Sequence, residues 1–182
     1  MDTLGVVESR GIAAGAELAD MMVKVADVEL VRAGTICSGR YLIYVSGDRE
    51  AVEASVTAAR ESGRPLKDSF VISNISPQVT AVLKKSQRAR LGDALGVIEC
   101  RSVSSGVNAA DCAVKQASIE LLRLVTGQGI NGKSYFVIGG DVAAVREAAE
   151  SAKTALGKNL LDAVVIPRPD ISVVRALTSG VR

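Results

Sequence analysis

Few residues of this chain could do chemistry, and the most unusual of them is Cys37. It stands in the segment TICSGRY, between two β-rich runs, and serine and glycine follow it directly. Free cysteines are usually buried as small apolar residues, so a thiol on a glycine-rich turn is a candidate ligand or reactive group. The chain has no histidine, which excludes an imidazole base, a catalytic triad and a histidine metal ligand.

The other candidate groups favour structural roles. Cys100 falls on a predicted strand and Cys112 near the start of a predicted helix, and no C-x-x-C spacing links the three cysteines. We therefore expect both to be buried thiols. Glu8 and Glu99 stand at equivalent strand ends, and neither has an acid or base nearby in sequence that could share a catalytic task. We expect no catalytic residues and a chain that is not an enzyme.

Residues 127–134, GQGINGKS, match the phosphate-binding pattern G-x-x-x-x-G-K-[ST]. Phosphate binding by this motif needs a helix that begins at the lysine and serine, so that the helix N-terminus faces the phosphates. Here YFVIGG follows, an aromatic and β-branched run typical of a strand, and the matching place in the first half of the chain is CSGRY. We therefore interpret this segment as a glycine-rich hairpin turn.

Composition limits the classes of function. The 182 residues are 48% hydrophobic, and the net charge of +2 is spread over mixed signs with few aromatic residues, which argues against nucleic acid as a partner. No apolar run approaches the ~20 residues of a membrane span, and no N-terminal stretch resembles a signal peptide. Three cysteines without a pairing pattern fit a reducing compartment. The sequence thus predicts a soluble, intracellular protein with no membrane partner.

The chain contains two copies of one sequence. LGVVESRGIAAGAELADMMVKVADVELVRAGT begins at Leu4 and aligns without gaps with LGVIECRSVSSGVNAADCAVKQASIELLRLVT, which begins at Leu95. GRYLIYVSGDREAV then matches GKSYFVIGGDVAAV, and LKDSFVISNISPQVTAVL matches LLDAVVIPRPDISVVRAL. A period of this length indicates a duplicated domain. We assign the first domain to residues 1–86, a polar linker to 87–93 and the second domain to 94–182.

Each copy predicts the same order of elements. A short apolar strand opens it, and in the first copy residues 14–26 follow with helical spacing, with Asp20 and Lys24 as an i,i+4 ion pair. Two β-rich runs flank the Cys37 turn, an alanine-rich helix follows with Asp48 as its N-cap, and a fourth strand and a short helix close the copy. The order β-α-β-β-α-β predicts an α+β fold of two tandem ferredoxin-like domains.

These motifs resemble those of bacterial microcompartment shell proteins of the tandem-domain, trimeric type. The resemblance covers Leu4 to about Leu177 and rests on the repeated LGxxE…AADxxVKxA…xELxR, on GDVAAV and on IPRP. The strand order is the unpermuted one, and the loops TICSG and GINGK are most similar to those of T-type shell proteins of propanediol-utilisation microcompartments. The resemblance implies a place in a microcompartment shell, in the cytoplasm, and a pseudohexameric homotrimer that tiles with hexameric shell proteins.

The resemblance also implies roles for individual residues. The loops between the second and third strands of each domain line the central pore, through Ser38, Gly39, Gly129, Ile130, Asn131 and Gly132. Lys24 and Lys115 correspond to lysines at the tile edge, and Arg168 to the arginine of a PRP motif that docks into a neighbouring tile. In the first copy ISNIS replaces IPRPD, so edge contacts are expected to alternate around the disc.

Three copies of Cys37 would meet around the axis of such a trimer. Converging thiolates make a soft metal site, and a cubane iron–sulfur cluster can bind through three of them. By resemblance to the T-type proteins, Cys37 is expected to hold one [4Fe–4S] cluster per trimer, on the threefold axis, for electron or cluster transfer across the shell. The alternative is a plain metabolite-conducting pore with no cluster, in which Cys37 is an incidental free thiol.

Overall fold

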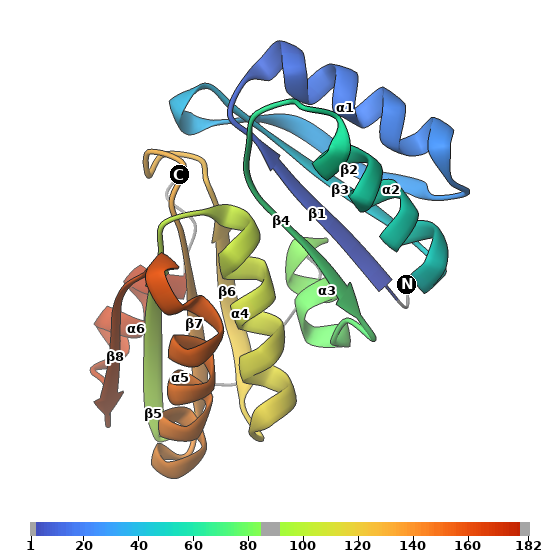
Figure 1. Ribbon diagram of the computed structural model, residues 1–182. Coiled ribbons are helices and arrows are strands. Elements are labelled where there is room, and N and C mark those ends of the chain that lie inside the picture. Colours follow the sequence, from blue (N-terminus) through green and yellow to red (C-terminus); the bar gives the residue numbers. More distant parts are fainter. Residues whose placement is uncertain (1–2, 85–91, 179–182) are drawn as a thin grey trace. The chain divides into compact units, whose positions relative to one another are not determined.

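The computed structural model describes residues 3–84 and 92–178 (Figure 1). The first copy of the repeat contains β1 (Thr3–Ser9), α1 (Ile12–Val25), β2 (Glu29–Ile36), the 3-10 turn η1 (Cys37–Gly39), β3 (Arg40–Gly47), α2 (Arg49–Glu61), β4 (Leu66–Ser73) and α3 (Pro77–Leu83). The second copy contains β5 (Ala94–Cys100), α4 (Val103–Gln116), β6 (Glu120–Thr126), β7 (Ser134–Gly140), α5 (Val142–Leu156), η2 (Gly157–Asn159), β8 (Leu160–Pro167) and α6 (Ile171–Thr178). Most of the predicted linker lies outside the described residues.

Internal contacts divide the chain into two units, and the bounds of these units do not coincide with the two copies of the repeat. The first unit comprises Met1–Ile75, Ser102–Ser105 and Thr126–Lys133, and the second comprises the remaining segments, Ser76–Arg101, Gly106–Val125 and Ser134–Arg182. The start of α4 and the loop before β7 therefore belong to the first unit, and α3 belongs to the second. The domain boundaries that the repeat suggests stay a prediction.

The first unit contains a four-stranded sheet in the order β2-β3-β1-β4, and each paired neighbour is antiparallel. Helices α1 and α2 lie on one face of it (Figure 1). Their apolar stripes bury Leu18, Met22, Val52 and Val56 against strand residues such as Ile43, which supplies the hydrophobic driving force for this layer. This is the sheet order of a ferredoxin-like domain, so the predicted α+β fold is confirmed.

The second unit repeats this sheet as β6-β7-β5-β8, with Glu99 of β5 opposite Tyr135 of β7 and Asp162 of β8. The helices α4 and α5 lie on the same side of it (Figure 1). Helix α3 joins this unit through Gln78, whose side-chain amide donates to the Ile119 carbonyl at 2.9 Å and accepts from the Leu121 N–H at 2.7 Å. The backbone at the start of β6 and just before it thus gains hydrogen bonds from a side chain of the first copy.

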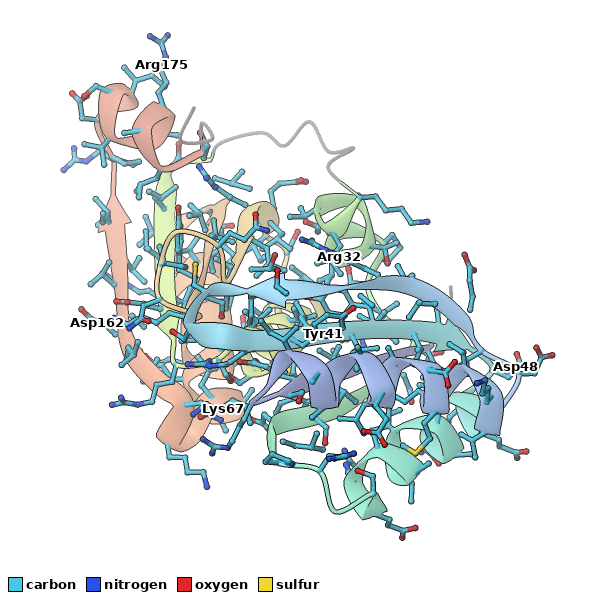
Figure 2. All side chains as sticks on the ribbon, turned by 90° about the horizontal axis from the view of Figure 1, so that it is seen from above. Arg32, Tyr41, Asp48, Lys67, Asp162 and Arg175 are labelled. Carbon is cyan, nitrogen blue, oxygen red and sulfur yellow. The ribbon has the colours of Figure 1, made fainter. Side chains whose placement is uncertain are left out.

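Three sequence expectations meet their structural test here. Residues 134–140 form β7 with no helix at the lysine and serine, so the turn interpretation of GQGINGKS is confirmed. Asp48, labelled in Figure 2, occupies the N-cap of α2 but makes no side-chain cap bond, whereas Asp141 accepts from the Ala144 N–H at 2.9 Å to cap α5. Asp20 and Lys24 form the predicted ion pair at 2.6 Å. No helix within the described residues is long and apolar enough to cross a membrane.

Candidate functional site

The two predicted pore loops lie side by side within the first unit. The Cys37 N–H donates to the Gly127 carbonyl at 3.3 Å, and the Gly129 N–H donates to the Cys37 sulfur at 3.1 Å. The Ser38 hydroxyl donates to the Asn131 carbonyl at 3.1 Å and also contacts the Asn131 Oδ1. The turn that carries Cys37 is therefore hydrogen-bonded along its length to the equivalent loop of the second copy.

The two loops share a backbone conformation at equivalent positions. Ser38 and Asn131 have φ of 67° and 55°, and the glycines that follow them, Gly39 and Gly132, have φ of 67° and 70°. This left-handed region suits glycine and is tolerated by asparagine, while it is uncommon for serine. The repeat thus preserves the shape of the turn although the second loop is longer, and the hydroxyl bond to Asn131 holds Ser38 in it.

Cys37 differs from the other two cysteines in its surroundings. It is half-buried, and a Cβ placed on the neighbouring Gly39 or Gly129 would meet no atom within 4 Å, so this end of the loops is open. Burial raises the pKa of the Cys100 thiol to about 12, as expected for a structural cysteine. The expectation of burial is wrong for Cys112, which is only half-buried because it borders an open groove between α4 and α5.

One chain supplies one thiol to this site. Among the described residues, no three His, Cys, Asp or Glu side chains gather closely enough to hold a metal ion. An amide N–H directed at a sulfur is a common feature of iron–sulfur ligation, because it stabilises the negative charge on the sulfur. Cys37 with the Gly129 amide therefore supplies one sulfur and one amide donor to this end of the loops.

Next to the loops lies a buried carboxylate whose partners the sequence did not reveal. The Glu8 side chain is 0% exposed, and its Oε1 accepts from Arg40 at 2.7 Å. Its Oε2 accepts the Val103 N–H at 2.9 Å, the Ser104 N–H at 3.2 Å and the Ser104 hydroxyl at 3.1 Å. Arg40 also donates to the Gly132 carbonyl at 3.0 Å. This cluster ties β1 and β3 to the start of α4 and to the second pore loop.

Glu8 stabilises the start of α4 for two physical reasons. The first N–H groups of a helix have no partner inside it, and the helix dipole places partial positive charge there, which favours an anion. Arg40 compensates the remaining charge of the carboxylate, as a buried acid requires. The signal that could have indicated this cluster is the repeat itself, because both copies keep the acid (Glu8, Glu99) and a base after the loop (Arg40, Lys133).

The three predicted tile-edge residues belong to other elements than the loops, namely α1, α4 and the turn after β8. Lys24 closes α1 with its side chain 71% exposed, and Lys115 occupies the equivalent place on α4, paired with Asp111. Arg168 is exposed and follows β8 in a left-handed conformation, φ 48°, which its first-copy counterpart Asn74 shares at φ 50°. The turn is thus retained in both copies while the side chain differs.

Comparison with known proteins gives the family. The family model of the BMC domain matches residues 3–75 and again residues 94–169. The chain is 36% identical over 180 residues to the bacterial microcompartment shell protein PduT of Citrobacter freundii, which covers 97% of this chain and 98% of that protein. It is also 45% identical over 71 residues, 39% of this chain and 64% of the other, to the carboxysome shell protein CcmK1 of Synechocystis sp..

A solved structure extends the similarity to the whole fold. The crystal structure of a microcompartment protein from Desulfitobacterium hafniense DCB superposes with a TM-score of 0.84 at 37% sequence identity, covering 96% of this chain and 99% of that one. The two sheets of the same topology and the duplicated sequence agree with this match. The chain belongs to the bacterial microcompartment shell proteins, as a member with two tandem BMC domains.

Proposed function

We propose that three copies of this shell protein form a pseudohexameric tile with a central pore, and that the three Cys37 thiolates bind one [4Fe–4S] cluster there. Proteins of this family form oligomers and associate with other shell proteins, and hexameric shell proteins are the partners we propose for the tile. When bound, such a cluster supplies one-electron transfer across the shell.

The environment of the Cys37 sulfur carries this proposal. The thiol stands at the open end of two glycine-rich loops and accepts the Gly129 N–H at 3.1 Å, so the chain already provides the amide that a thiolate ligand needs. Small residues flank it, which leaves room for a bulky inorganic group and for neighbouring copies. The loops are held by Ser38 and Asn131, so the sulfur is positioned before any ligand arrives.

Anaerobic purification followed by an iron count and a visible spectrum tests the proposal. We expect iron and acid-labile sulfide at four of each per trimer, together with a broad visible absorbance that dithionite bleaches. Cys37→Ser should lose both completely while the trimer persists, because a hydroxyl is a poor, largely protonated ligand for iron. Cys112→Ser is the matched control, since that thiol is also half-buried, and it should keep the iron.

Two results would contradict the proposal. Wild-type protein that holds no iron after reconstitution would leave the plain metabolite pore as the better function. If iron is retained in Cys37→Ser and lost in Cys112→Ser, the iron ligand is Cys112 on α4 and not a residue of the loops. The size of the particle is read separately by light scattering, so a trimer without iron and a monomer without iron are distinguished.

A further inference from the structure

The loop of the second copy keeps one part of a phosphate-binding motif. Residues 127–134 match the sequence pattern, but residues 134–140 form β7, so no helix N-terminus follows the loop. The motif also binds anions through a second feature, a nest, in which successive backbone N–H groups converge on one negatively charged group. A nest needs no helix, so this loop can retain the anion-binding half of the motif.

The backbone of the loop alternates in the way that a nest requires. The φ angle is 83° at Gly127, 76° at Gly129 and 55° at Asn131, and it is not positive at Gln128 or Ile130 between them. Alternation of positive and negative φ turns successive N–H groups toward one side of the chain. Within the described residues, the N–H groups of Gln128 and Ile130 donate to no protein atom. They therefore remain donors on either side of the Gly129 N–H.

A sulfur of the same chain lies at this loop. The Gly129 N–H donates to the Cys37 sulfur at 3.1 Å, and the Cys37 N–H donates to the Gly127 carbonyl at 3.3 Å. Gly127 is fixed by packing, because a Cβ there would stand 2.9 Å from Val103 and 3.1 Å from Ile36. The donor of the loop and the sulfur are thus held together before any ligand binds.

The positive character around this sulfur comes from backbone amides. The nearby Arg40 donates to the Gly132 carbonyl at 3.0 Å, which ties it to the same loop. Its charge is compensated by the buried Glu8, which accepts from it at 2.7 Å. Aligned N–H groups carry partial positive charge without a counter-ion. The loop, and not the arginine, is therefore the group that can stabilise negative charge on the Cys37 sulfur.

We infer that residues 127–131 form an anion nest for the Cys37 sulfur, and that this nest sets the reduction potential of the cluster. The inference rests on the proposed function for the cluster, while the nest itself belongs to the single chain. N–H groups directed at sulfur stabilise the more negative, reduced state, so they raise the potential. The Gln128 and Ile130 N–H groups would serve further anionic sulfur atoms. The second copy, which has no thiol in its loop, thus contributes donors where the first contributes the ligand.

The substitution Gly129→Val tests the effect on the potential. A Cβ at Gly129 meets no atom within 4 Å, so the change acts through the backbone, because a β-branched residue rarely adopts positive φ. Gly63→Val is the matched control, since Gly63 has φ 74° and equally open surroundings in the loop between α2 and β4. In a redox titration, Gly129→Val should lower the ratio of reduced to oxidised cluster at fixed potential by about tenfold, which is about 59 mV for one electron. Gly63→Val should leave it unchanged.

A second measurement uses the iron-free protein. The alkylation rates of Cys37 with anionic iodoacetate and neutral iodoacetamide are compared by mass spectrometry of its peptide, and the ratio of the two rates reports the potential at the sulfur. Cys112 is the internal reference, because its groove contains Glu147 and Glu150. We expect the ratio at Cys37 to exceed that at Cys112 by about threefold, the size expected for a few aligned amides. Gly129→Val should remove this excess and leave the ratio at Cys112 unchanged.

The outcomes separate the nest from the cluster. A wild type that holds no iron, but whose alkylation ratio at Cys37 falls in Gly129→Val, would contradict the cluster and support the nest. A wild type that holds iron, with potential and alkylation ratio unchanged in Gly129→Val, would overturn the nest and leave the proposed function standing. Equal shifts in Gly129→Val and Gly63→Val would also contradict the inference. If Gly129→Val does not fold, the wild type decides, since a ratio at Cys37 no higher than at Cys112 overturns the nest.

Discussion

The starts of α4 and α1 occupy the same place in two copies of one fold, yet one is buried and the other is open. The α4 sequence begins VSSG and the α1 sequence IAAG, so the two helices begin with similar side chains. The two helix starts differ in their hydrogen-bond partners. Glu8 accepts the first amides of α4, whereas no side chain in the described ranges caps α1. Duplication within a chain therefore gives one of two equivalent helix starts an internal anion, while the other stays exposed.

The two loops show a second consequence of duplication. Cys37 and Ile130 occupy matching positions, on turns with the same left-handed residues, but only one carries a thiol. A ring of six identical domains would present six equivalent side chains, whereas three duplicated chains can present three thiols and three isoleucines. Fusion of two domains thus allows a ligand number that sixfold symmetry would not.

The largest expected effect distinguishes the two glutamates. Glu8→Gln should lower the free energy of unfolding by about 3 kcal/mol or more, because it leaves Arg40 and two helix amides without their anion. Glu99→Gln, whose side chain is only partly buried, should lower it by about 1 kcal/mol or less in the dissociated chain. Urea unfolding at a concentration low enough to populate single chains measures both.

A double variant strengthens this comparison. Glu8→Gln combined with Arg40→Gln removes the charge from both partners, and it should lose less stability than the two single changes added together. Additive losses would mean that the ion pair contributes little and that the amide contacts of Glu8 dominate. Equal losses in Glu8→Gln and Glu99→Gln would show that the difference in burial between the two glutamates does not decide their contributions to stability.

The next effect concerns packing beneath the two helix starts. A Cβ on Gly15 would overlap with the Cβ of Tyr41, which lies on β3 (Figure 2), and would stand 2.6 Å from the first ring carbon. A Cβ on Gly106 would overlap mainly with the Ser134 hydroxyl, which can rotate. We expect Gly15→Ala to cost about 2 kcal/mol or more and Gly106→Ala about 1 kcal/mol. Thermal unfolding of both variants checks the order, and a larger loss for Gly106→Ala would reverse it.

The fold could be predicted from the sequence because its signals are local or repeated. Helical spacing around Leu18 and Met22, the apolar strands, and the glycines of the loops each predict their own element, and the second copy confirms each of them independently. The turn at residues 127–134 was recognised for the same reason, because the run after Lys133 has strand character. Local signals also placed Cys37 on a turn between two strands.

The contacts of the site could not be predicted, because their partners are distant in the chain. Arg40 is 32 residues from Glu8, and Ser104 is 96 residues from it, and no periodicity connects them. The absence of a C-x-x-C spacing likewise led us to expect a buried Cys112, although the groove between α4 and α5 leaves it half-buried. The membership of α3 in the second unit depends on Gln78 and on Asp111, which accepts the Ser76 N–H at 2.7 Å.

The pH dependence of stability should report the buried thiol of the second copy. The pKa of Cys100 is about 12 in the folded chain and about 8.5 when unfolded. Between these values the folded state binds more protons, so stability is complete below about pH 8.5 and falls as the pH rises. We expect Cys100→Ala to flatten the loss of stability between about pH 9 and 10 by up to about 1.4 kcal/mol per pH unit. Urea unfolding across this range measures it, and Ser9→Ala, the matching position in the first copy, should not flatten it.

The smallest effect distinguishes the two lysines predicted at the tile edge. Lys24 pairs with Asp20, which is 62% exposed, whereas Lys115 pairs with Asp111, which is 3% exposed. Lys24→Ala should change the free energy of unfolding by less than about 0.5 kcal/mol, because an exposed i,i+4 pair contributes little. Lys115→Ala should cost about 1 kcal/mol, because the buried carboxylate that also accepts the Ser76 N–H loses one partner. Thermal unfolding of both variants and of Lys115→Arg, which keeps the charge and should restore most of the stability, checks the difference.

A second measurement compares incorporation into shells. If Lys24→Ala lowers incorporation without lowering stability, the loss indicates an edge contact, because folding is unaffected. A Lys24→Ala variant as destabilised as Lys115→Ala would show that burial of the acid partner does not decide the contribution of the lysine.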